Sequence, residues 1–519
     1  MLFHKIQLKS VGDISLRLFL TCWFVYTLHF ATNTVREIYP ALSLAENLSF
    51  DVSEYLGFHP DIFEIPGRGA YINNNPGASL LGAIPYAVTR PAIDQIVGRV
   101  NTARITSNGE VPEYDTIYPM AREFYRQAYE KGLDIKFGLA AGVMQAFLMA
   151  PLSALSVVVM FFILANLTKS TQKALMLALL FGFATPVFYR TAQLNHNLLE
   201  GIFAFFAFVL LWRPWDTPEK PGKPYYLTAG LIAGWTIVLD YSGIIVVLII
   251  GLYAFFRWYS QPREERRLAD LARFGIGIMI SALVLLGYQW LAFGNPFYPA
   301  QHYMPQTTFS GYGYQGLDWP QLDLIWLLSF GSQYGIFISA PLLLLVLYIP
   351  GWLNNKIRLI GKLETWTILF FSIALLLFTA ANQFSRMQFN SGIRHIVPVI
   401  PFLFLIAAGV YLRLPTWLAI VFGVFATYWS WALAMYRDVE QGLGIYEAII
   451  QITSRGPQLP WLSTLQSLGL VPSWMSAWIV FTFAGVVLLA IWSVRFPRFT
   501  FEWSMSFQKN NNKLTHHDN

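Results

Sequence analysis

The chain has 519 residues, of which 55% are hydrophobic and 12% are charged. A soluble globular protein carries about 25% charged residues, so this composition excludes an ordinary soluble fold and places most of the chain in lipid. The net charge of +6 is too diffuse to indicate a nucleic-acid partner. The single cysteine, Cys22, excludes an internal disulfide and a cysteine-based metal site.

Apolar stretches long enough to cross a bilayer recur along the chain. A transmembrane helix needs about 20 apolar residues, and this length predicts twelve spans. They lie near residues 14–33, 139–165, 172–190, 194–212, 225–240, 242–258, 273–293, 324–350, 365–383, 396–412, 415–435 and 475–495. Asp240, Tyr241, Ser242 and Gly243 divide one long run into a hairpin of two helices. We therefore predict an all-α polytopic membrane protein.

Lysine and arginine gather in alternate loops, which sets the predicted orientation. Basic residues fill the loops near 169–173, 213–223, 257–273 and 356–362 and the tail. The bias predicts cytoplasmic N- and C-termini in a plasma (inner) membrane and contact with membrane lipids. We divide the chain into a transmembrane core (1–435) with an outer loop (34–138), an outer loop with the last helix (436–495), and a cytoplasmic tail (496–519).

The first outer loop is the longest polar region between spans. Its apolar stretch Ala78–Thr89 is too short to span and contains Pro85, so we predict a helix that lies in the outer interface. Region 94–135 carries alternating charges at helical spacing, which predicts a second surface helix.

Glu37 is the first candidate catalytic residue. It follows directly on the first span, so it is held at the membrane surface, where a carboxylate can act as a general base on a hydroxyl group. The neighbouring Arg36 can hold the charge of Glu37 or bind a lipid phosphate. An ordinary charge pair at a helix end is the structural alternative.

Asn75-Pro76-Gly77 is a turn that leads into a helix, and a helix start suits a phosphate. The same turn also serves simply to begin a helix. No Asp-x-Asp pair appears on the predicted outer face, so neither a metal nor any other cofactor is indicated. A metal site at His59 and Asp61 remains an alternative.

Cationic side chains come from two further outer segments. Arg190 and His196 flank one turn, and Arg394 and His395 precede a span, so all four are candidates to bind a donor phosphate. Structural roles at turns and interfaces are the alternative. Aromatic and amide side chains of the outer segments are candidates to bind a sugar or an acceptor: Tyr39, Tyr71, Asn75, Gln301, His302, Tyr303 and Asn390.

In order and spacing, these elements resemble the GT-C glycosyltransferases that use a polyprenyl-phosphate sugar, including bacterial relatives of the protein O-mannosyltransferases and the aminoarabinose lipid A transferase. The resemblance covers residues 10 to about 435. It is carried by Glu37 with Tyr39, by Asn75–Leu81, by His196, by Phe293–Phe297, and by 329–341 followed by Gly392–Pro398.

The resemblance implies a GT-C-like fold and an extracytoplasmic active site. There a sugar passes, with inversion, from a polyprenyl-phosphate carrier to a lipid, glycan or protein acceptor. It implies that Glu37 is the catalytic carboxylate. Many members have Asp-Glu or Asp where this chain has Val35-Arg36-Glu37, so Asp51 is the second choice.

Two other classes of protein share some of these features. A flippase or transporter for lipid-linked sugars needs polar residues along a path across the bilayer, and the predicted spans have few. A non-catalytic scaffold or carbohydrate-binding subunit shares the aromatic loops but needs no acid at Glu37. A single cavity containing Glu37, His196 and Arg394 would favour the enzyme.

Overall fold

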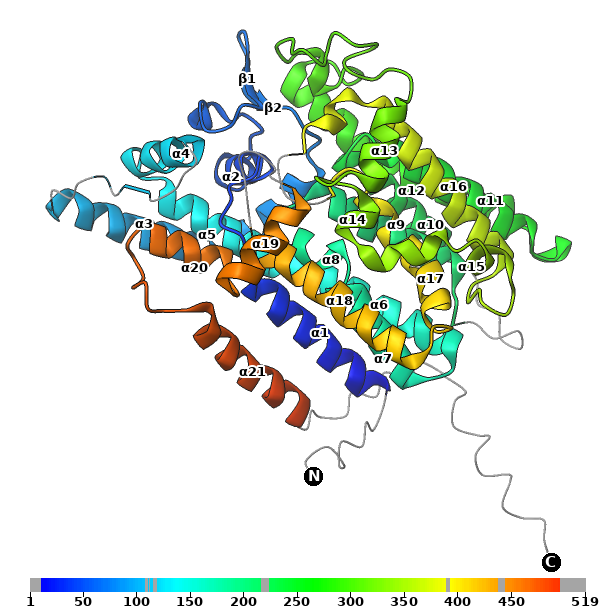
Figure 1. The fold of residues 1–519 in the computed structure, drawn as a ribbon. Coiled ribbons are helices and arrows are strands. Elements are labelled where there is room, and N and C mark those ends of the chain that lie inside the picture. The colour runs from blue at the N-terminus through cyan, green and yellow to red at the C-terminus, as the bar shows by residue number, and fades with distance from the viewer. Residues whose placement is uncertain are drawn as a thin grey trace, which may run out of the picture.

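The computed structural model describes residues 11–107, 111, 113–114, 119–215, 224–388, 393–436 and 444–494. The fold is mostly helical (Figure 1). The α-helices are α1 (Val11–Leu28), α2 (Ile38–Asn47), α3 (Gly77–Ser107), α4 (Pro119–Glu130), α5 (Asp134–Met144), α6 (Ala150–Thr168), α7 (Thr171–Phe183), α8 (Pro186–Arg190), α9 (His196–Trp212), α10 (Tyr226–Leu239), α11 (Gly243–Tyr259), α12 (Leu268–Phe293), α13 (Leu322–Phe330), α14 (Ile336–Ser339), α15 (Pro350–Leu353), α16 (Lys362–Ala381), α17 (Ile400–Tyr411), α18 (Thr416–Met435), α19 (Ile445–Arg455), α20 (Pro460–Ser467) and α21 (Ala477–Ser493). A π-helical turn, η2 (Gln145–Met149), joins α5 to α6. Short 3₁₀ turns include η4 (Ala300–His302), η5 (Pro341–Leu347) and η7 (Val397–Val399).

Several helices have the length and composition of membrane spans. Among the described residues, four continuous helices are long and apolar enough to cross a bilayer: 134–168, α12, α16 and α18. Shorter apolar helices of 10–17 residues accompany them: α7, α9, α10, α11, α17 with its preceding turn, and α21. These helices agree with a helical membrane protein.

Two of the predicted spans are not single helices. The segment 324–350 is divided into α13, α14, η5 and α15. Pro341 and Pro350 lack the backbone N–H that would continue a helix, and each begins a new turn. The segment 172–190 is interrupted between α7 and α8, where the Thr185 hydroxyl accepts a hydrogen bond from the Val187 N–H and Pro186 begins α8.

The helix predicted at 78–89 is longer than predicted. That stretch is the start of α3, which runs for 31 residues and contains both Pro85 and Pro91. A proline removes one backbone hydrogen bond from a helix, but α3 continues through both prolines. Ile84 and Val88 are 62% and 78% exposed, so the first half of α3 presents apolar side chains outward. The second predicted surface helix is present as α4, with Arg126 between Glu123 and Glu130.

The polar segments between the predicted spans contain more structure than the sequence predicted. Strands β1 (Ile62–Ile65) and β2 (Gly69–Ile72) form an antiparallel hairpin, so the described part of the chain is not entirely α-helical. Segment 436–474, expected to be a loop, contains α19 and α20. In Figure 1 the hairpin, α2 and α4 lie at one end of the helices, whereas the junction of α6 and α7 lies at the other.

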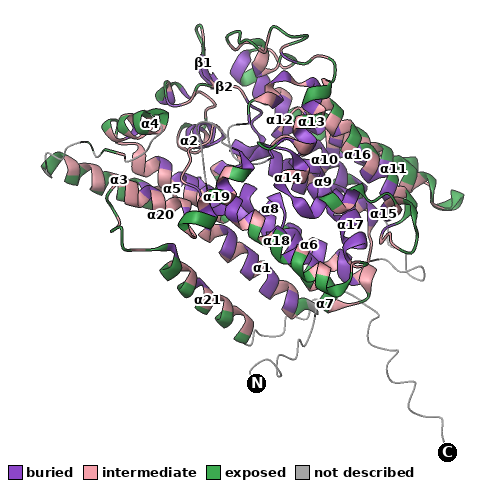
Figure 2. Ribbon diagram, in the orientation of Figure 1, coloured by how far each residue is buried: buried purple, intermediate pink, exposed green. Residues whose placement is uncertain are grey.

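Two glycines allow the close packing that positions the site. A Cβ on Gly77, the first residue of α3, would lie 2.6 Å from the carbonyl oxygen of Val238 near the end of α10. A Cβ on Gly201, in the second turn of α9, would lie 2.9 Å from Cα of Pro398. Only glycine fits such approaches. The start of α9 is therefore held against the segment that carries Arg394. The buried residues coloured in Figure 2 include the helices on both sides of these contacts.

Candidate active site

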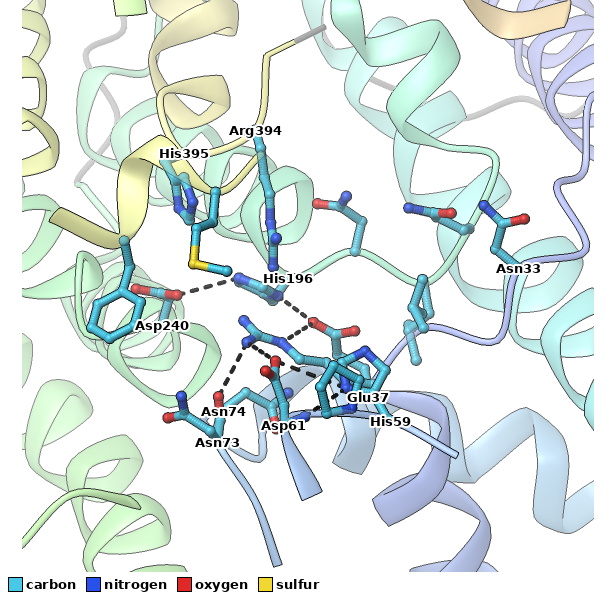
Figure 3. A pocket seen from close by; sticks show the side chains of 18 of the residues that line it. Asn33, Glu37, His59, Asp61, Asn73, Asn74, His196, Asp240, Arg394 and His395 are labelled. Carbon is cyan, nitrogen blue, oxygen red and sulfur yellow. Dashed lines mark hydrogen bonds and ion pairs between the residues drawn. The ribbon is translucent and has the colours of Figure 1, made fainter. Parts of the chain in front are cut away.

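A cavity of about 1200 Å³ opens where the loops after α1 and β2 meet the α8–α9 turn, the α10–α11 turn and the segment before η7. Figure 3 shows that Glu37, His196, Asp240 and Arg394 all point toward one another in this cavity, although they come from four different parts of the chain. The geometry of these side chains determines what the cavity can do chemically.

Glu37 lies between α1 and α2 and is 3% exposed. Its backbone carbonyl accepts a 2.7 Å hydrogen bond from the Ser79 hydroxyl, so the start of α3 fixes its position. Its carboxylate oxygen Oε1 lies 2.5 Å from Nδ1 of His196 and 3.5 Å from Nε of Arg36. Glu37 is therefore a buried carboxylate held between His196 and Arg36.

His196 is the first residue of α9, and the side chain of Asn195 caps that helix by accepting a hydrogen bond from the Leu198 N–H. The imidazole lies between two carboxylates: Nδ1 faces Glu37, and Nε2 is 3.3 Å from Oδ2 of Asp240. Whichever ring nitrogen carries the proton, a carboxylate oxygen faces it as an acceptor.

The two carboxyl groups that flank His196 are both shifted toward the ionised form. Burial opposes ionisation of Glu37, but the hydrogen bond and charge of His196 and the charges of Arg36 and Arg394 hold its pKa well below the ordinary value. The pKa of Asp240 is lowered in the same way: burial opposes ionisation, whereas His196 and the backbone N–H of Ser242 favour it. Both side chains are consequently anions at neutral pH.

Arg36 links Glu37 to a second acid. Its Nη1 donates to Oδ2 of Asp61 at 2.8 Å and to the backbone oxygen of Asn73 at 3.2 Å. His59 accepts a hydrogen bond from the backbone N–H of Asp61 through Nδ1. Burial lowers the pKa of His59, with the charge of Arg36 acting in the same direction. Arg36 therefore holds the carboxylates of Glu37 and Asp61 in place.

Arg394 faces the cavity without a partner for its guanidinium: within the described segments, this group forms neither a hydrogen bond nor an ion pair. Its backbone N–H donates to the side chain of Gln388. Burial and the nearby charge of Arg36 lower the pKa of Arg394 to about 10, so it is still cationic at neutral pH. Burial beside Arg394 also keeps the pKa of His395 well below its ordinary value. Arg394 is thus a charge available to an anion.

A second hydrogen-bond chain leads from the site into the protein. The Ser242 hydroxyl lies 2.9 Å from Oδ1 of Asp240 and 2.9 and 3.0 Å from the two carboxyl oxygens of Glu200, which is fully buried in α9. The Ser242 hydroxyl therefore joins the two carboxyl groups.

The structure places eight of the fourteen sequence-predicted residues on the cavity wall: Arg36, Glu37, Asn75, Arg190, His196, Gln301, Arg394 and His395. Five others do not line it. Asp51 accepts hydrogen bonds from the backbone N–H groups of Ser53 and Ala70, so it braces the hairpin. Asn390 lies outside the described residues.

The remaining four residues outside the cavity wall have aromatic side chains that pack. Tyr39 is fully buried and contacts Tyr55 and Phe137. Tyr71 and Tyr303 both pack on Phe293, and His302 stacks on Tyr298. Asn75, although on the wall, donates to the backbone oxygen of Ile237 and so joins the loop to α10.

Sequence reasoning missed Asp240 as a site residue because its position at a hairpin tip indicated a helix cap. It does brace the start of α11 through Ser242 as well. Asp61 was considered only for a metal, and no group of three or more potential metal ligands occurs among the described residues. Asn33 and Gln193 line the wall and carried no sequence signal.

Comparison with known proteins adds no relative. No family model, curated protein or solved structure matches the chain. The fold and the site are therefore the basis for the function.

Proposed function

We propose that the protein is an integral-membrane glycosyltransferase that moves a sugar from a polyprenyl-phosphate carrier to a hydroxyl acceptor. The observation that supports this most directly is the presence of Glu37, His196 and Arg394 in one cavity. An ionised, buried carboxylate and a guanidinium that has no partner among the described residues are the two groups that such a transfer needs at its two ends.

In the proposed reaction, the acceptor hydroxyl attacks the anomeric carbon, and the new bond from oxygen to carbon forms as the bond from carbon to the phosphate oxygen breaks. The proton of the hydroxyl passes to Glu37, and the electron pair of the broken bond leaves with the phosphate. One such displacement inverts the anomeric carbon. The carboxylate also stabilises the positive charge that develops on the sugar ring in the transition state.

The leaving phosphate gains negative charge during this step, and the cationic side of the cavity is suited to receive it. Arg394 can offer two parallel N–H donors to phosphate oxygens. Donors that are already in place for a developing charge contribute strongly to catalysis, because they need no rearrangement during the reaction. Lipid phosphate is a good leaving group by itself, so the proposal requires no metal ion.

We further propose a twelve-span topology with both termini in the cytoplasm and the cavity on the extracytoplasmic side of the plasma membrane. Two features support this: the alternation of basic loops along the sequence and the location of the cavity among the polar loops at one end of the helices. A site at that level lets the prenyl chain remain in lipid while its phosphate reaches the cavity.

The cavity favours an enzyme over the two alternatives. A scaffold has no need for a buried acid with a 2.5 Å hydrogen bond to histidine, an arrangement that costs desolvation of both groups. A flippase requires an open path across the bilayer, whereas the charged groups of the cavity lie in loops at one end of the helices.

The test is sugar transfer in membranes that contain either the wild-type protein or Glu37→Gln at equal expression. Radiolabelled polyprenyl-phosphate sugar extracted from the same cells serves as donor. We expect the variant to lose at least about 99% of donor consumption, since the amide cannot accept the proton. Glu54→Gln, in the same loop but outside the cavity wall, is the control. Normal turnover by Glu37→Gln would disprove the assignment of the base.

A further inference from the structure

Amide groups on the cavity wall lack hydrogen-bond partners. Oε1 of Gln193 and Nδ2 of Asn33 are buried atoms with no partner among the described residues, and Gln193 as a whole is 4% exposed. Buried polar groups in folded proteins are nearly always paired. A buried donor and a buried acceptor that face a cavity therefore indicate a ligand able to supply both kinds of partner.

These amides lie beside the proposed base. The backbone N–H of Ala31 donates to the carbonyl of Ala192 at 2.9 Å, so the segments that carry Asn33 and Gln193 run next to each other. The same two segments continue to Glu37 and His196, which are hydrogen-bonded. In Figure 3, Asn33 lies to one side of Glu37, and Asp240 and His395 lie to the other. A group bound to the amides thus lies beside the segments that lead to Glu37 and His196.

Among the described residues, α4 and segment 458–467 contribute no charged side chain to the wall on this side, whereas Arg190, three positions before Gln193, also lines the cavity. The lining residues from α4 and from 458–467 carry no charge: Met120, Ala121, Phe124, Tyr125, Gln458, Pro460, Ser463, Thr464 and Ser467. The Thr32 and Thr464 hydroxyls share a hydrogen bond of 2.7 Å, and Tyr125 stacks against Tyr114. We call Asn33, Gln193 and these residues the amide flank.

The wall across the cavity has a different chemistry. It contains apolar side chains, mostly from α12, α16 and the loop between α12 and α13: Leu285, Leu286, Phe297, Phe309, Phe378 and Phe384. Polar side chains from the same elements, among them Gln289, Gln301 and Thr379, also line it. The apolar part of this wall suits a hydrocarbon chain.

We propose that the amide flank is the acceptor subsite and that the acceptor is a neutral carbohydrate. This inference rests on the proposed glycosyl transfer and specifies its acceptor. A sugar ring presents several hydroxyls around the one that reacts, and each can donate and accept at once, which satisfies both Gln193 and Asn33. A phosphorylated glycolipid needs cations, which the lining residues from α4 and 458–467 do not supply. A peptide can pair with the amides through its backbone N–H and C=O groups, so transfer to a peptide is the competing outcome that the test distinguishes.

The experiment uses the full-length protein in detergent with radiolabelled polyprenyl-phosphate sugar and three probes: a mixture of neutral oligosaccharides, a peptide rich in serine and threonine, and a phosphorylated glycolipid. Two rates are measured, donor hydrolysis by water and transfer to each probe. The variants are Gln193→Leu and Asn33→Ala. Gln383→Leu is the control, since Gln383 is equally buried, at 5% exposed, and does not line the cavity.

We expect transfer to the oligosaccharides, with KM for them raised about tenfold by Gln193→Leu and by Asn33→Ala, and unchanged by Gln383→Leu. Donor hydrolysis should stay at the wild-type rate in Gln383→Leu, which lies outside the cavity wall. Preferred transfer to the peptide or the phosphorylated glycolipid, or unaltered KM values, would overturn the acceptor assignment alone. No donor consumption by the wild-type protein would instead overturn the proposed function and this inference with it. Thermal unfolding checks folding: leucine removes an unpaired buried group at position 193, so stability should not fall.

Discussion

Glu37 and His196 are 159 positions apart in the chain, yet their side chains form a 2.5 Å hydrogen bond inside the cavity. Different helices fix the positions of Glu37 and His196. The Ser79 hydroxyl holds the backbone of Glu37, and the cap of α9 holds His196. The pair therefore depends on the packing of α3 and α9 against the loop after α1, and it links the proposed base to the second acid, Asp240.

This pair leads to a prediction about pH. Burial alone would raise the pKa of Glu37, and the hydrogen bond and charge of His196 are the main effects that reverse it. His196→Asn removes the imidazole and its interactions with Glu37, so burial should then dominate and the pKa of Glu37 should rise. Because the base must be ionised, the acid limb of the profile of kcat against pH should move upward by about one to two units.

The measurement is kcat for donor consumption between about pH 4 and about pH 9. His302→Asn is the matched control, because His302 packs on Tyr298 outside the cavity wall and should leave the limb in place. An acid limb that stays at the wild-type position in His196→Asn would mean that His196 does not control the charge of Glu37.

Arg394 provides the second prediction. Its guanidinium has no partner within the described segments and faces the cavity, so Arg394→Ala should raise KM for the lipid-phosphate donor by about 10- to 100-fold, since a charge-assisted hydrogen bond contributes about 1.5–3 kcal/mol. KM for the acceptor should change little. Arg394→Lys keeps the charge but loses the paired N–H geometry, so it should restore part of the loss.

Arg386→Ala is the control for this series, because Arg386 pairs with Asp323 and does not itself line the cavity. Initial rates at varied donor and acceptor concentrations separate the two KM values. An equal rise in both would show that Arg394 supports the cavity as a whole and does not bind the phosphate.

Asp240 provides a third prediction. Its carboxylate faces Nε2 of His196 at 3.3 Å and contacts the Ser242 hydroxyl, so it orients the imidazole from the side opposite Glu37. Asp240→Asn keeps the shape but removes the charge. We expect kcat to fall about 10- to 100-fold, as is typical when an orienting partner is lost, with KM for the donor unchanged.

A positioning role for Asp240 can be distinguished from a structural one by the pH profile. Loss of the anion should disturb His196 and shift the acid limb, whereas a simple packing defect should lower the rate equally at every pH. Asp323→Asn, a carboxylate in an ion pair elsewhere, is the control. A uniform drop for Asp240→Asn would refute the positioning role.

Composition and hydrophobic length predicted the helical character of the chain, because apolar residues at helical spacing carry that information locally. They did not predict the breaks at Thr185 and Pro341, since a long apolar stretch still looks continuous when it contains a single proline or helix cap. The length of α3 was missed for the opposite reason: Pro85 indicated an end that tertiary packing overrides.

Within the site, sequence order located Glu37, His196 and Arg394 but not their relation to Asp240. A hairpin tip indicates only a cap from local sequence, and the packing of α9 beside α10 decides what the carboxylate faces. The unpaired amides of Asn33 and Gln193 were also not predictable, because whether an amide lacks a partner depends on the whole surrounding fold.

Asp51, the second-choice base from sequence, provides the last prediction. Its Oδ1 accepts hydrogen bonds from the backbone N–H groups of Ser53 and Ala70, and it does not line the cavity. The hydrogen bonds from Ser53 and Ala70 lower its pKa, although burial opposes this. Asp51→Asn should therefore weaken the attachment of the β1–β2 hairpin by about 1 kcal/mol and leave kcat within about twofold of the wild-type value.

The two expectations for Asp51→Asn are measured separately. Limited proteolysis should show faster cleavage near residues 66–69 at the hairpin tip, and donor consumption should persist at temperatures below unfolding. Glu54→Gln serves again as the control, because Glu54 is an exposed carboxylate in the same loop. Loss of turnover with an intact hairpin would transfer the role of base from Glu37 to Asp51, because a carboxylate that only braces the loop has no direct part in the proton transfer.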